Sequence, residues 1–289
     1  MSVRLEPDWK RGRQADGLRH RESAPGALSI ALVSGKGGVG KSLLAVNLSL
    51  ELAAHGSLGR VLLVDGDAGL ANADLLLGWV PERSLTDWID GRATLDDVVT
   101  RGREGLDLLV SGPSPDALAL LERLASGRLA DANRTPFGDQ RVRVFDLGAG
   151  IGCEVVGLAS ACDRVWLVAT PEPTSLADAY AMARRLVEAR PDVALELIVN
   201  RAADADEGAR THAALERMTQ RFLGRRLPLR AVLPEDPRVL RAVARQEPLS
   251  TSAPQAPYTR RMRLLAESLA EEVASRAPAS AERPFDHAS

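Results

Sequence analysis

The chain has 289 residues, enough for one large α/β domain with a full core and flexible ends. A net charge of −2 and an isoelectric point near 6.2 exclude the basic composition typical of nucleic-acid-binding domains, so direct nucleic-acid binding is not expected. The two cysteines, Cys153 and Cys162, make neither a disulfide framework nor a C-x-x-C metal pattern, which favours a reducing cytoplasm. Residues 1–27 are too polar for a secretory signal, and no apolar run could span a bilayer.

Short apolar runs alternate with helical patterns along the chain. The runs predict strands at residues 28–33, 61–65, 106–110, 142–146, 164–169, 195–200 and 229–233. The helical patterns lie at residues 43–54, 84–89, 116–125, 176–188, 209–222, 236–245 and 258–276. Because most runs are apolar throughout, they are typical of parallel strands covered on both faces. The fold class is therefore predicted as α/β, with a doubly wound, mostly parallel sheet of about seven to eight strands.

The two ends of the chain differ from the region between them. Residues 1–27 form a polar arm that we expect to be flexible. Residues 277–289 are rich in Ala, Ser and Pro and are expected to form a disordered tail. One nucleotide-binding domain is expected to span residues 28–276.

Residues 34–42 read S-G-K-G-G-V-G-K-S and match the phosphate-binding P-loop pattern G-x-x-x-x-G-K-[ST]. The segment follows a predicted strand and precedes a predicted helix, which is the context that the motif requires. Backbone N–H groups of such a loop bind phosphate oxygens. The predicted phosphate-binding residues are Gly35, Gly37, Gly38, Val39, Gly40, Lys41, Ser42 and Leu43. Lys41 would contact the β- and γ-phosphates and Ser42 would contact Mg²⁺; the alternative is an ordinary glycine-rich turn.

Two predicted strands end in aspartate, Asp65 and Asp146. The carboxyl ends of parallel strands face the ligand crevice of such a sheet, so both carboxylates are candidates for the Mg²⁺ site. Gly148 follows Asp146 closely and would let a backbone N–H approach the γ-phosphate. The alternative is that each aspartate only caps a helix or a turn.

The extra lysine of the loop gives the chain a family resemblance. Lysine is rare here, with Lys10, Lys36 and Lys41 among 37 lysines and arginines. The pattern K-G-G-V-G-K-S at residues 36–42 resembles the deviant Walker A motif of the MinD/ParA ATPases, and the likeness covers roughly residues 28–270. It implies an ATP-dependent homodimer in which Lys36 reaches the partner's phosphates. It also implies that ATP or ADP binds with Mg²⁺.

The same resemblance implies roles for further residues. Asp67 would orient the attacking water, and Asn72 would support the switch I segment. Asp65 and Asp146 would belong to the Mg²⁺ shell. The residues expected near the adenine base are Asn200, Pro234 and Asp236.

Three segments resemble the flagellar number regulators of this family, known as FlhG or FleN. They are residues 67–78, 170–180 and 239–249. The resemblance implies a cytoplasmic ATPase that regulates the number or placement of flagella. Flagellar C-ring proteins and a flagellar transcription activator are further candidate partners, and attachment at the cell pole or the inner membrane face stays open.

The arm carries a second resemblance to these regulators. Residues 13–19 read R-Q-A-D-G-L-R, close to the D-Q-A-x-x-L-R helix with which such regulators activate FlhF, a signal-recognition-type GTPase. Gln14 would act in the partner's GTPase site. Arg13 replaces the acidic residue of the pattern, and the alternative is a basic disordered tail.

Several features depart from the family pattern. Leu147 stands where the family usually has Thr, which puts turnover in doubt more than nucleotide binding. Leu147 therefore keeps a nucleotide-occupied regulatory module with negligible turnover as an alternative. Another positioning ATPase, for a polar, pilus or secretion system, is a further alternative with the same chemistry, from which the N-terminal arm would distinguish the flagellar role. Both cysteines are expected as buried thiols. The last helix has an apolar stripe that predicts packing on the core rather than membrane binding.

Overall fold

The computed structural model describes residues 27–67, 72–126 and 140–276. These residues form one sheet of eight strands in the order β3-β4-β2-β5-β1-β6-β7-β8. The strands are β1 Leu28–Val33, β2 Arg60–Gly66, β3 Val99–Arg101, β4 Leu106–Val110, β5 Gln140–Leu147, β6 Arg164–Ala169, β7 Leu195–Ala202 and β8 Leu229–Pro234. Neighbouring strands are parallel, apart from the antiparallel pair of β3 and β4. The predicted α/β, mostly parallel sheet is confirmed.

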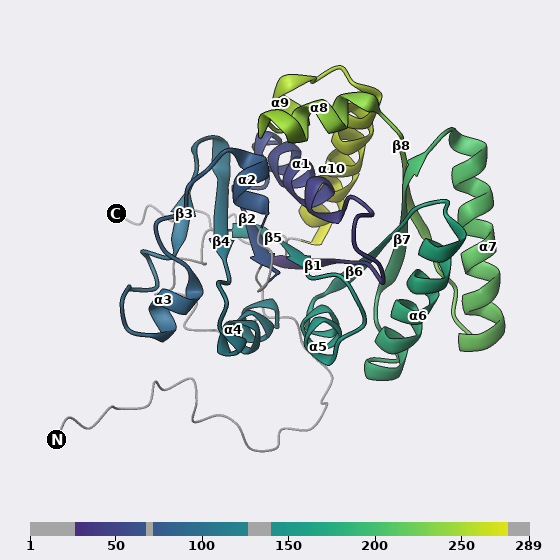
Figure 1. Ribbon diagram of the computed structural model, residues 1–289, viewed down its shortest axis with the longest axis horizontal. Coiled ribbons are helices and arrows are strands. Elements are labelled where there is room, and N and C mark those ends of the chain that lie inside the picture. Colours follow the sequence, from purple (N-terminus) through teal and green to yellow (C-terminus); the bar gives the residue numbers. More distant parts are fainter. Residues whose placement is uncertain (1–26, 68–71, 127–139, 277–289) are drawn as a thin grey trace, which may run out of the picture.

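Helices cover both faces of the sheet (Figure 1). One face packs against α1 Lys41–Ala54, α2 Ala73–Leu77, α8 Pro237–Arg245, α9 Leu249–Ser252 and α10 Pro257–Arg276. The other packs against α3 Leu85–Ile89, α4 Pro115–Ala125, α5 Cys153–Ala161, α6 Pro173–Ala189 and α7 Ala205–Leu223. Along β1, Ile30 belongs to the first core and its neighbour Ala31 to the second. This alternation explains why the strand sequences are apolar throughout.

Most predicted helices and strands are present, and the differences between prediction and structure have physical reasons. The bounds of β1, β4 and β6 agree with the predicted ranges. Three short elements were not predicted, because three to five residues are too few for a clear periodic pattern; they are the edge strand β3 and the helices α2 and α9. The helix α5 was not predicted because its sequence C-E-V-V-G-L-A-S-A has no polar face. β7 continues two residues beyond Asn200, which therefore lies within the strand rather than at its end.

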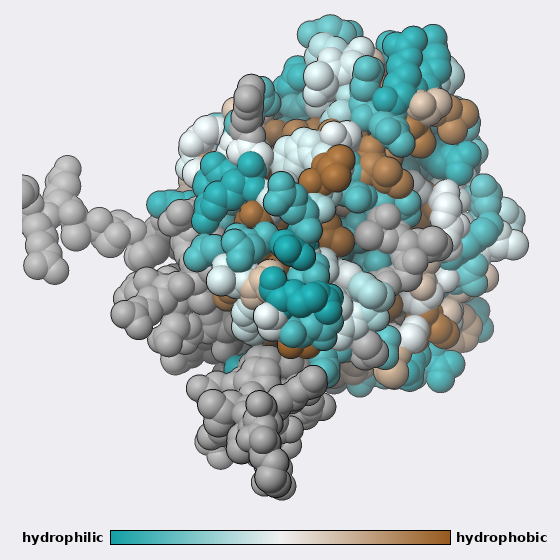
Figure 2. Space-filling view, turned by 60° about the vertical axis from the view of Figure 1, so that its left-hand side comes forward, coloured by the Kyte–Doolittle hydropathy of each residue, from teal (hydrophilic) through white to brown (hydrophobic). Residues whose placement is uncertain are grey.

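The last helix packs on the core, as its stripe predicted. On α10, Met262 and Leu269 are fully buried. Among the residues described, no helix is long and apolar enough to cross a bilayer. On the face drawn in Figure 2, apolar side chains lie in small areas between polar ones, as on an ordinary water-facing surface.

Candidate functional site

The P-loop connects β1 to α1 near the middle of the sheet (Figure 1). Gly40 has a φ of 89° at the start of α1, a left-handed conformation that favours glycine. A Cβ at Gly40 would lie 2.4 Å from Asn200 Nδ2, so a side chain also lacks room there. Asn200 Nδ2 donates to the Val39 carbonyl at 2.7 Å and so ties the loop to β7. The loop therefore has the conformation that its glycines predict.

Lys41 and Asp146 form a buried ion pair beneath the loop. Lys41 Nζ lies 2.5 Å from Asp146 Oδ1, and the two side chains are 7% and 2% exposed. The first turn of α1 and the end of β5 bring these groups together. The pair places the loop lysine and the strand-end carboxylate in one site, as the sequence predicted.

Asp65 lies opposite Asp146, because β2 and β5 pair in parallel with these two residues in register. The Asp65 carboxylate is fully buried. Burial, and second the negative charge of Asp146, raise the pKa of Asp65 to about 6, while three backbone N–H bonds oppose the rise. Those bonds come from Asp67 at 3.1 Å, from Asn72 at 2.9 Å and from Ala73 at 2.9 Å.

Asp67 lies beside the segment that follows β5. A Cβ at Gly148 would lie 3.8 Å from either carboxylate oxygen of Asp67. Gly150 N donates to the Ser34 carbonyl at 3.0 Å, so this segment also adjoins the P-loop. The structure thus brings Asp67 and Gly148 together next to the loop, while residues 68–71 lie outside the description.

Lys36 contacts two residues that the sequence did not single out as its partners. Its Nζ lies 3.1 Å from Glu172 Oε2 and 3.2 Å from Thr174 Oγ1, at the start of α6. The Lys36 and Glu172 side chains are 41% and 55% exposed. The only signal was their place in the distinctive segment 170–180, which cannot show a contact with a residue so distant in sequence.

Two buried side-chain oxygens, Oδ1 of Asn200 and Oδ2 of Asp236, can accept hydrogen bonds but have no donor among the described residues. They belong to neighbouring strands: Asn200 lies in β7, two residues before its end, and Asp236 lies just after β8, which ends at Pro234. Asp236 Oδ1 caps α8 by accepting from Arg238 N at 3.0 Å. The role of Asn200 Oδ1 and Asp236 Oδ2 at the adenine base stays a prediction.

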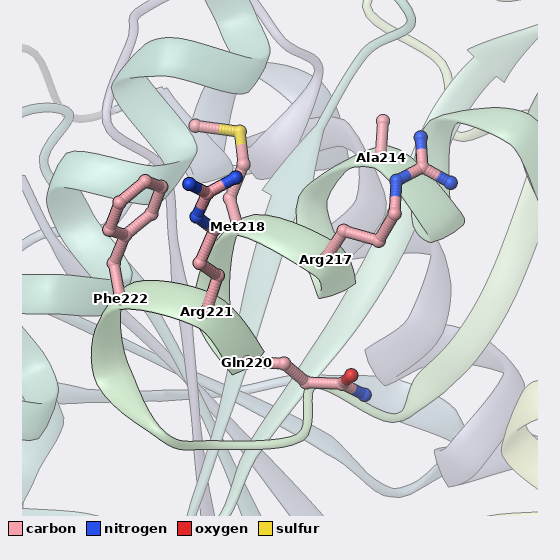
Figure 3. Close-up of a pocket in the computed structure, with 6 residues that line it drawn as sticks. All are labelled: Ala214, Arg217, Met218, Gln220, Arg221 and Phe222. Atoms are coloured by element: carbon pink, nitrogen blue, oxygen red, sulfur yellow. The ribbon is translucent and has the colours of Figure 1, made fainter.

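A surface hollow lies apart from this site. Figure 3 shows its lining residues, which all belong to α7: Ala214, Arg217, Met218, Gln220, Arg221 and Phe222. The hollow shares no residue with the predicted site, and the P-loop chemistry is therefore the better guide to function.

Comparison with known proteins identifies the family. Residues 30–249 match the CobQ/CobB/MinD/ParA nucleotide binding domain. The chain belongs to this family. It is 38% identical to the antiactivator FleN of Pseudomonas aeruginosa over 78% of this chain and 80% of FleN. It is 32% identical to the flagellum site-determining protein YlxH of Helicobacter pylori, over 64% of this chain and 62% of YlxH.

The fold agrees with that of a solved MinD/ParA structure. The cell division ATPase MinD of Pyrococcus furiosus superimposes with a TM-score of 0.68 and 25% identity, covering 85% of this chain and 99% of MinD. The predicted family and the predicted P-loop fold are thus confirmed.

One prediction was wrong, and one residue departs from the family pattern. The prediction of two buried thiols was wrong for Cys153, which is exposed at the first turn of α5, while Cys162 is buried. The reason is that Cys153 is the first residue of α5, in a stretch where its neighbours Gly152 and Glu154 are exposed as well. Leu147 is 1% exposed and packs in the second core, so it offers no polar group to the site. Gln14 lies outside the described residues.

Proposed function

We propose that this chain is a Mg²⁺-dependent ATPase that dimerises around ATP and regulates the number or placement of flagella. The observation that carries the enzymatic part is the buried pair of Lys41 and Asp146. ATP phosphates in the loop would compete for Lys41, because they carry more negative charge than one carboxylate. Release of Lys41 would free Asp146 for the metal.

The residues present suit Mg²⁺. Ser42 is the second residue of α1, beside the loop, and can supply a hydroxyl oxygen, while Asp146 can supply a carboxylate, directly or through water. Within the described ranges, no group of three His, Cys, Asp or Glu side chains is placed to hold a metal. A two-residue site still fits Mg²⁺, which commonly binds through one or two protein groups plus phosphates and waters. When bound, Mg²⁺ would offset the charge of the phosphates.

The two side-chain oxygens of Asn200 and Asp236 that lack a donor among the described residues favour adenine over guanine as the base of the bound nucleotide. An adenine amino group donates hydrogen bonds, whereas guanine carries an acceptor oxygen at the same ring position. Asn200 Oδ1 and Asp236 Oδ2 could accept from the amino group but would repel the oxygen. We therefore propose ATP as the preferred nucleotide.

Lys36 is proposed to act across the dimer. Within one chain it is held by Glu172 and Thr174. An exposed ion pair of this kind contributes about 1 kcal/mol or less, so little free energy is needed to release Lys36. In the dimer its charge would stabilise the phosphates of the partner's ATP, and Asp67 would orient the attacking water. Loss of the γ-phosphate would then weaken the dimer.

The flagellar assignment rests on the similarity to FleN and YlxH. Because FleN is described as an antiactivator, a flagellar transcription activator is a proposed partner. The arm with Gln14 is proposed to stimulate an FlhF-type GTPase. The similarity to MinD keeps another positioning role as the second candidate. A GTPase assay with a peptide of residues 1–27 separates the two, because only the flagellar role requires stimulation that a Gln14→Ala peptide loses.

Light scattering after size exclusion tests the ATPase cycle. With ATP, the Asp67→Ala variant should accumulate as a dimer because hydrolysis is slowed, and the Lys41→Ala variant should stay monomeric. One common mass for wild type and both variants would contradict the proposal.

A further inference from the structure

The buried carboxylate of Asp65 is turned toward the chain that follows it. Oδ1 accepts from the backbone N–H of Asp67, and Oδ2 accepts from those of Asn72 and Ala73. Asp65 itself is fixed in β2, which is hydrogen-bonded on both sides by β4 and β5. One carboxylate in a central strand therefore binds the backbone at Asp67 and, farther along the chain, at Asn72 and Ala73.

This geometry does not suit an inner-sphere magnesium ligand. A carboxylate offers about four acceptor positions, and three N–H groups already occupy positions on both oxygens of Asp65. Each N–H presents its positive end to the carboxylate, so a cation entering there would meet like partial charges. Asp146 differs, because its nearest partner is the movable side chain of Lys41.

We propose that Asp65 is a positioning residue for ATP hydrolysis and not a magnesium ligand. Its bonds fix the backbone at Asp67, Asn72 and Ala73, and so keep the Asp67 carboxylate beside Gly148. This inference rests on the proposed ATPase function and assigns a different task to a residue that the family resemblance places in the metal shell.

The Asp65→Asn variant tests the idea because it keeps the size of the side chain. An amide accepts through only one oxygen, so it cannot serve Oδ1 and Oδ2 partners together, and its NH₂ group would face backbone N–H groups. We expect amide exchange at Asn72 and Ala73 to quicken about tenfold in the nucleotide-free protein, with the strand amides of β5 unchanged. We expect kcat to fall about tenfold or more with little change in KM.

A magnesium titration at saturating ADP distinguishes the two roles. The midpoint should shift by less than about twofold in Asp65→Asn, but by about tenfold or more in Asp146→Asn, the positive control. An Asp107→Asn variant controls for loss of a buried strand carboxylate, since Asp107 binds the side chains of Arg60 and Gln140 instead. It should leave exchange at Asn72 unchanged.

A raised magnesium midpoint in Asp65→Asn with unchanged exchange at Asn72 and Ala73 would overturn the proposal. If the wild type does not hydrolyse ATP, the proposed function fails and a role of Asp65 in hydrolysis fails with it, while the exchange and magnesium measurements still decide whether Asp65 anchors the backbone or binds the metal.

Discussion

Lys41 and Asp146 are more than a hundred residues apart in sequence, yet their charged groups lie 2.5 Å apart in a buried site. Asp65 faces Asp146 from the neighbouring strand, so Lys41 offsets the charge of a carboxylate pair. In the nucleotide-free protein this lysine is therefore a structural cation as well as the proposed ligand for phosphate.

Removal of Lys41 should destabilise the nucleotide-free protein. Breaking a buried ion pair leaves one charge unpaired, which costs about 3–5 kcal/mol. We expect Lys41→Ala to lower the free energy of unfolding by about 3 kcal/mol in urea titrations. The double variant Lys41→Met, Asp146→Asn should recover most of this loss, because neither unpaired charge remains. Additive losses in the double variant would show that the two groups do not interact.

Weakening the contact of Lys36 should favour the ATP dimer. Glu172→Gln removes the charge that holds Lys36 in its own chain. Because an exposed pair contributes about 1 kcal/mol at most, we expect dimerisation with ATP to tighten by up to about fivefold, as measured by sedimentation. Glu188→Gln is the matched control, since Glu188 pairs with Arg184 on the same helix, again at an exposed position. Equal effects of both substitutions would argue against a specific restraint.

Two glycines of the loop should respond differently to alanine. Gly38 and Gly40 both have positive φ, at 78° and 89°, but only Gly40 lacks space for a Cβ. We expect Gly38→Ala to lower the free energy of unfolding by about 1 kcal/mol through backbone strain alone. Gly40→Ala must also displace Asn200, so the loss should be about 2–3 kcal/mol. Equal unfolding midpoints in the two variants would contradict the contact with Asn200.

The stability of the nucleotide-free protein should depend on the ionisation of Asp65. Its pKa in the folded state is about 6, above the ordinary 3.8, so the folded state binds the proton more tightly. This contribution is present below pH 3.8 and is lost as the pH rises through 6. A rise of about two units corresponds to about 3 kcal/mol. We therefore expect the stability of wild type relative to Asp65→Asn to fall by up to that amount between pH 4 and 7 in urea titrations, whereas parallel curves would refute the shift.

The sequence was sufficient to predict the sheet, and it singled out the loop lysine and the strand-end aspartates that the structure brings close together. Parallel strands that are buried on both faces appear in the sequence as apolar runs, and a P-loop appears as glycines and a lysine in a fixed order. Each feature is therefore visible in one continuous stretch of sequence. These patterns predicted the region of the P-loop, the strand-end aspartates Asp65 and Asp146, and the family. They did not reveal α5, because the small and apolar residues of that helix leave no polar face to give a helical period.

Only the tertiary structure decided which of these groups touch. Strand order brings Lys41 to Asp146. The packing of α6 against the loop brings Glu172 to Lys36. Asp65 shows most clearly what the sequence could not predict, because a position at the end of a strand suits a metal ligand and a backbone anchor equally well. Local sequence determines where a side chain lies along an element, whereas its partners depend on how distant elements pack together.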